Sequence, residues 1–162
     1  MKKLSRSFLI SGLLVIAAAA SASAQTATQT VTFQVDAINL IGVTGTPSLV
    51  INSATPGSAP TSATSVGNSW AVTTNQTGAK ITASIASNMP AGLTLWATMG
   101  APAGATSAGA KSLSTVAVDM VTTITKLAAS ALALSYQLDA TAAAGVVTST
   151  TRVVTFTITG GV

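Results

Sequence analysis

The residues of this chain that could perform acid–base, nucleophilic or metal chemistry are few and widely spaced. The sequence contains no histidine, no cysteine and no glutamate, so the usual general base and the commonest metal ligands are missing. Serine and threonine hydroxyls are abundant, but each would need an activating base beside it. We therefore expect no enzymatic activity, no cofactor and no dedicated metal site.

The only carboxylates are those of Asp36, Asp119 and Asp139, in the contexts VDA, VDM and LDA. None has the D-[TS]-G pattern expected of a catalytic carboxylate pair. Asp36 and Asp139 fall on the outward phase of alternating segments, so the simpler interpretation is two solvated carboxylates at strand ends. The alternative is a calcium site shared by the two, because Ca²⁺ prefers oxygen ligands.

The first residues have the pattern of a secretory signal peptide. Lys2, Lys3 and Arg6 give a positively charged start, residues 8–20 are mostly apolar, and SASAQ supplies an A-x-A cleavage signal. The apolar stretch is short for a bilayer span, which needs about 20 residues. We predict that residues 1–24 are removed on export. The mature protein would then have no membrane span and be periplasmic, on the cell surface or extracellular.

Removing the signal peptide changes the charge of the chain. The whole chain has a formal net charge of +4, but the mature part keeps four basic residues against three aspartates, which gives +1. These four basic residues are scattered, whereas a nucleic-acid-binding surface needs clustered basic side chains. We therefore expect no nucleic-acid partner. Residues 25–162 suit a single domain whose core forms without disulfides.

Alternation of apolar and polar residues predicts an all-β protein. Threonine and valine, which are β-branched and favour strands, are abundant, and all five prolines fall in connectors. The pattern predicts a single antiparallel β-sandwich, immunoglobulin-like or pilin-like, of about seven to nine strands. The alternating segments are residues 30–36, 49–52, 69–74, 80–85, 93–99, 132–139 and 152–159.

One further segment, residues 113–129, is ambiguous. Val116, Met120 and Leu127 also fit a helical stripe. The density of β-branched residues favours a bent strand instead.

The phase of each strand assigns the aromatic side chains. Trp96 shares its phase with Thr94 and Thr98, on the opposite face from the apolar residues of its strand. Its ring either covers neighbouring structure, which is the simpler interpretation, or stacks on a ligand such as a polysaccharide. Four aromatic residues share the phase of apolar neighbours and are predicted to lie in the core: Phe33, Trp70, Tyr136 and Phe156.

The first and last alternating segments have the same pattern of apolar and polar residues. In the simpler interpretation, residues 30–36 are the first strand of their own domain and lie beside the last strand in a shared sheet. The alternative is a donor strand that completes the sheet of a neighbouring subunit, because the chain lacks the charges that usually protect sheet edges. The apolar faces available for such strand exchange are Val31, Phe33 and Val35 in the first segment and Val154, Phe156 and Ile158 in the last.

The stretch ATQTVTFQVDA and the closing LALSYQLDAT…RVVTFTITGGV resemble secreted fimbrial and spore-coat-like β-sandwich proteins of bacteria. The resemblance covers the mature chain in general pattern and implies a structural subunit that assembles with copies of itself. The chain departs from chaperone–usher pilins, which usually carry a disulfide.

These observations leave two functions open. The first is an exported surface protein that self-associates, as a fimbria-like filament, through strand edges. The second is a secreted, non-catalytic module that binds a polysaccharide or another surface, with Trp96 as its first contact residue.

Overall fold

A computed structural model describes residues 24–161 of the chain. Residues 1–23, nearly all of the predicted signal peptide, lie outside the described residues. The described chain divides into two units, residues 24–34 and residues 35–161. The first unit contains no regular secondary structure, and the second contains all the strands that are described.

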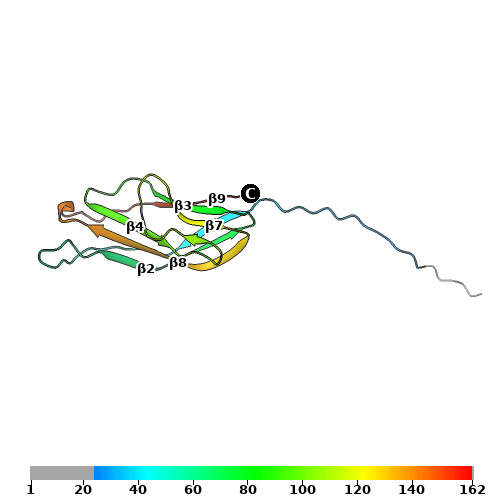
Figure 1. Ribbon diagram of the computed structural model, residues 1–162, viewed down its shortest axis with the longest axis horizontal. Coiled ribbons are helices and arrows are strands. Elements are labelled where there is room, and N and C mark those ends of the chain that lie inside the picture. Colours follow the sequence, from blue (N-terminus) through cyan, green and yellow to red (C-terminus); the bar gives the residue numbers. More distant parts are fainter. Residues whose placement is uncertain (1–23, 162) are drawn as a thin grey trace, which may run out of the picture. The chain divides into compact units, whose positions relative to one another are not determined.

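Nine strands and one short 3₁₀ helix make up the regular structure of the described residues (Figure 1). In this part of the chain no helix is long and apolar enough to cross a membrane. The elements in chain order are β1 (Asn39–Thr44), β2 (Ala63–Thr74), β3 (Ala79–Ile85), β4 (Leu93–Met99), β5 (Thr106–Ser107), β6 (Lys111–Ser112), β7 (Val118–Ile124), β8 (Leu127–Ala140), η1 (Ala142–Ala144) and β9 (Val154–Thr159).

The strands form two sheets in which every pairing is antiparallel. The larger sheet has the order β1-β2-β8-β4-β6, and the smaller has the order β5-β7-β3-β9. The two longest strands, β2 and β8, lie side by side within the larger sheet (Figure 1). The predicted class, an all-β antiparallel sandwich of seven to nine strands, is confirmed.

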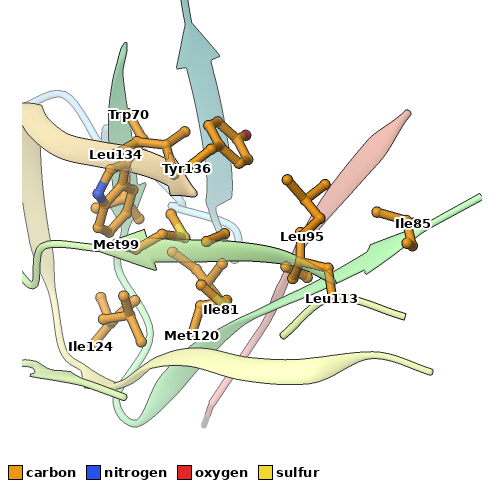
Figure 2. Close-up of a cluster of buried hydrophobic side chains, with 14 of the residues drawn as sticks. Trp70, Ile81, Ile85, Leu95, Met99, Leu113, Met120, Ile124, Leu134 and Tyr136 are labelled. Atoms are coloured by element: carbon orange, nitrogen blue, oxygen red, sulfur yellow. The ribbon is translucent and has the colours of Figure 1, made fainter. Parts of the chain in front are cut away.

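Apolar side chains from both sheets form one buried cluster (Figure 2). Trp70, Met99 and Leu134 come from the larger sheet, and Ile81 and Met120 come from the smaller one. Each of these side chains is at most 3% exposed. The two sheets therefore pack face to face, with alternate residues of each strand pointing into the shared core.

Trp70 is the largest side chain of this core. Its Nε1–H donates a hydrogen bond to the carbonyl oxygen of Gly100 at 3.1 Å, so burial leaves the indole donor satisfied. Val72 lies two residues further along the same face and is also buried, as is Tyr136 on β8. The core positions that strand phase predicted for Trp70 and Tyr136 are confirmed.

A bulge lets β2 follow β8 along its length. The pairing register shifts between Ser65 and Asn68, and Gly67 inside this bulge has a φ of +83°, which a side chain would strain. The buried Asn68 side chain closes the bulge by donating from Nδ2 to Oγ of Ser65 at 3.3 Å. Glycine and asparagine are therefore placed where the strand must kink.

The structure also corrects some sequence-based boundaries. Residues 30–36 and 49–52 alternate in sequence but belong to no strand, because alternation specifies two faces and does not supply a neighbouring strand. The sequence pattern does not predict strand β1, because apolar and polar residues do not alternate regularly in NLIGVT. Residues 113–129 contain no helix and supply β7 and the start of β8, as their β-branched content predicted.

Trp70 provides a direct test of this core. We expect Trp70→Ala to lower the free energy of unfolding by about 3–5 kcal/mol, because it leaves a large cavity and an unpaired carbonyl oxygen. Val66→Ala is the matched control on the same strand, since Val66 is 80% exposed, and its effect should stay within about 0.5 kcal/mol. Urea unfolding followed by tryptophan fluorescence and circular dichroism measures both. Similar stabilities for the two variants would contradict the assignment of Trp70 to the core.

Candidate functional site

The apolar side chains of residues 30–36 are exposed. Val31 is 72% exposed, Phe33 90% and Val35 78%. The prediction that Phe33 lies in the core is therefore wrong, and these residues are not the first strand of the sandwich. Several exposed apolar side chains close together are typical of an interaction site rather than of an ordinary surface.

The matching residues at the other end of the chain, Val154, Phe156 and Ile158, lie on β9. All three are half-buried and pack against the core cluster. β9 pairs with β3 over its whole length, whereas the first strand, β1, belongs to the other sheet. The expectation that the first and last alternating segments lie side by side in one sheet is therefore wrong for two segments of the same chain. Among the described residues, no strand pairs with the second edge of β9.

The two sides of the sandwich end in different kinds of edge strand. On one side the outermost strands are β5 and β6, each of two residues. On the other side they are β1 and β9, each of six residues, which contact each other across the two sheets. Neither NLIGVT nor VTFTIT contains a charged residue or a proline, the residues that usually block pairing at an edge. The β1/β9 side is therefore the side open to strand addition.

A cavity of about 870 Å³ opens between the two sheets near the start of β9. This volume lies in the range of pockets that bind ligands, roughly 300–1,000 Å³. Among its lining residues only Arg152 is charged, and the Arg152 guanidinium donates to carbonyl oxygens of its own chain, at 3.2 Å for Asn88 and 2.8 Å for Thr151. The apolar lining includes Leu49, Ile51, Met89, Leu93, Leu138 and Val154.

Trp96 lies on the outer face of β4, half-buried, as its phase predicted. Its Nε1–H donates to Oδ2 of Asp139 at 2.8 Å. The second oxygen of Asp139 accepts hydrogen bonds from Oγ of Ser62 at 2.6 Å and from Nε2 of Gln137 at 2.8 Å. A hollow of about 300 Å³, lined also by Thr98, adjoins the ring.

These hydrogen bonds hold the pKa of the Asp139 carboxyl below its usual range. The hydrogen bond from Ser62 contributes most, followed by that from Gln137, and slight burial acts in the opposite direction. Asp139 is therefore an ionised acceptor that joins the segment before β2 to β4 and β8. These hydrogen bonds account for the position of the Trp96 ring on the outer face of β4 without a bound ligand.

Asp36 and Asp139 lie at opposite ends of β2. The carbonyl oxygen of Asp36 accepts from Nδ2 of Asn75, just after β2, at 2.7 Å, whereas Asp139 binds Ser62, just before β2. The 12 residues of β2 separate these points by roughly 35 Å. A calcium site shared by the two carboxylates is excluded by this separation. No group of three or more metal-ligating side chains occurs in residues 24–161.

Comparisons of the chain with protein-family models, curated proteins and solved structures found no match. The resemblance to fimbrial and spore-coat-like proteins therefore stays a prediction from the sequence pattern.

The Asp139 cluster predicts a pH dependence of stability. Because the folded-state pKa lies below the ordinary value near 4, the carboxylate stabilises the fold above pH 4 and loses this contribution as the pH falls through the folded-state pKa. Asp139→Asn should remove this part of the acid destabilisation, by at most about 1 kcal/mol for so exposed a group. Ser62→Ala, which removes the main donor, should reduce it while keeping the carboxylate. Urea unfolding between pH 2 and 7 measures the effect, and identical profiles for all three proteins would contradict it.

Proposed function

We propose that the protein is an exported structural subunit that associates with copies of itself through β-strand edges, with residues 30–36 as the donor strand. One observation carries the proposal: Val31, Phe33 and Val35 alternate in phase but are exposed, in a segment that forms no strand in its own chain. Strand addition gives such a segment both backbone hydrogen bonds and pockets for its alternate side chains.

Burial of apolar side chains is the main term that favours association between copies. Complete burial of a valine or phenylalanine side chain stabilises by about 1.5–3 kcal/mol, and three are available in one short segment. The ordering of an extended segment opposes association, so backbone pairing without this burial would be weak. The mature chain carries a net charge of only +1, so little electrostatic repulsion opposes contact between copies.

A second candidate function is binding of a polysaccharide on the outer face of β4 and β8. The observation in its favour is the hollow beside Trp96, which Thr98, Ser135 and Gln137 also line with polar groups. Aromatic rings flanked by hydrogen-bonding side chains suit the mixed surface of a sugar ring. We favour self-association because the binding candidate leaves the exposure of Phe33 unexplained.

The donor role of residues 30–36 predicts a separation of assembly from folding. In the mature protein, replacing Val31, Phe33 and Val35 together by threonine should abolish polymers, because threonine keeps strand propensity and removes most of the apolar surface. The urea midpoint should stay unchanged, because these side chains are not buried in the sandwich. Size-exclusion chromatography with light scattering and negative-stain microscopy measure assembly.

The matched control is Val66→Thr with Val116→Thr, since these valines are 80% and 71% exposed and lie outside the segment. The control should polymerise like the unmodified protein. A monomeric unmodified protein, or a triple variant that still polymerises, would refute the proposal.

The binding candidate makes a different prediction. If the outer face of β4 binds a polysaccharide, Trp96→Ala should weaken retention on the immobilised polysaccharide about tenfold, which corresponds to about 1.4 kcal/mol. Trp96→Phe, which keeps a ring and loses the indole N–H, should retain most of the binding. Affinity electrophoresis against a panel of soluble polysaccharides measures this. Equal mobility of all three proteins would eliminate the candidate.

A further inference from the structure

We infer that the acceptor for the donor strand is the cavity of about 870 Å³ beside the start of β9, so that subunits join head to tail. This inference rests on the proposed function and deepens it, because it names the receiving site and the direction of growth.

The donor segment leaves the sandwich at the end of β2. The side chain of Asn75, the residue after β2, binds the backbone of the incoming chain with both its donor and its acceptor group. Its Nδ2 donates to the carbonyl oxygen of Asp36 at 2.7 Å, and its Oδ1 accepts from the backbone N–H of Ile38 at 2.8 Å. Residues 30–36 therefore precede a fixed point at this end of the molecule.

The cavity lies at the opposite end of β2. Its lining includes Leu138 near the end of β8, and Leu138 pairs with Ala63, the first residue of β2. Leu93 at the start of β4 and Val154 at the start of β9 line the same space. The fixed point at Asp36 and the cavity are thus separated by about the length of β2, roughly 35 Å.

The chain is too short to fill its own cavity. Phe33 lies three residues before Asp36 and can extend at most about 11 Å from it, since an extended chain advances no more than about 3.6 Å per residue. Val31, five residues away, reaches about 18 Å. A donor segment that enters the cavity must therefore belong to a second copy.

The cavity and the free edge of β9 together suit this occupant. Val154 belongs to both, so a strand laid along β9 enters the cavity where the edge begins. Val50 and Val147 line the cavity and are themselves 69% and 39% exposed, which leaves apolar surface at its rim for a partner to cover. Val31, Phe33 and Val35 provide matching apolar side chains on every second residue.

Donor and acceptor at opposite ends give the assembly a direction. Each subunit gives its segment at one end and receives a segment at the other, which is a heterologous contact. Such contacts continue into an open chain unless the rotation between subunits closes a ring. The geometry therefore specifies a head-to-tail assembly, either an open filament or a closed ring of several subunits.

The test uses two kinds of variant of the mature protein. Phe33→Asp disables the donor and leaves the cavity intact, whereas Val147→Lys places a charge at the cavity rim and leaves the donor intact. Val50→Lys is a second acceptor variant at an independent exposed position. Val116→Lys is the matched control, because Val116 is 71% exposed, lies outside β1 and β9 and does not line the cavity.

We expect each disabling variant to be monomeric alone and Val116→Lys to polymerise like the unmodified protein. A mixture of Phe33→Asp with Val147→Lys should form a 1:1 heterodimer that grows no further, because only one donor and one acceptor remain compatible. Light scattering coupled to size exclusion measures the mass of each species, and circular dichroism verifies that every variant is folded.

The outcomes distinguish a failure of the acceptor site from a failure of the proposed function. If both acceptor variants polymerise normally while Phe33→Asp does not, the acceptor lies elsewhere and the inference fails, but the proposed function stands. Closed dimers of the unmodified protein would overturn the head-to-tail geometry. If the unmodified protein stays monomeric, the proposed function itself fails.

Discussion

The pairing of β2 with β8 is the interaction on which the rest of the structure depends. These are the longest strands, and they extend from Ala63 opposite Leu138 to Thr74 opposite Leu127. β4 adds to the free edge of β8 along its C-terminal half, but β1 covers only the second half of β2, from Ser69 to Thr74. The first half of β2 therefore forms an edge of the larger sheet, and the cavity lies at that end of β2. The short length of β1 thus leaves part of the longest strand pair without a flanking strand.

Side-chain hydrogen bonds secure both ends of this long pair without the help of disulfides or buried charges. At one end Asn75 holds the incoming chain, and Oγ1 of Thr74 donates to Oδ1 of Asn39 on β1 at 2.7 Å. At the other end Asp139 accepts from Ser62 and Trp96. Neutral donors on a single exposed carboxylate avoid the desolvation cost of a buried ion pair. In a chain with only 6% charged residues, hydrogen bonds of polar side chains secure both ends of this strand pair.

Strand periodicity predicted which face each side chain occupies, and it could not predict which strands are neighbours. Trp70 and Trp96 were assigned correctly to core and surface because the phase of a strand is a local property. Phe33 was assigned wrongly because its burial depends on whether a partner strand exists, which is a non-local property. The Asp139 cluster is also non-local, since Ser62 and Trp96 lie 77 and 43 positions away in sequence. The cavity is non-local as well, because Leu49, Leu93 and Val154 line it from distant parts of the sequence.

In the proposed assembly, the free edge of β9 and residues 30–36 match in length. β9 offers six residues of unpaired edge, and residues 30–36 form an alternating segment of similar length. Register between them would be strongly specified, because a shift by one residue would turn Thr32 and Gln34 toward the apolar cavity and return Phe33 to water. The opposite side of the sandwich ends in the two-residue strands β5 and β6, which are too short to add a strand productively. Among the described residues, the long strand edges that could accept a further strand, β1 and β9, therefore lie on one side of the sandwich.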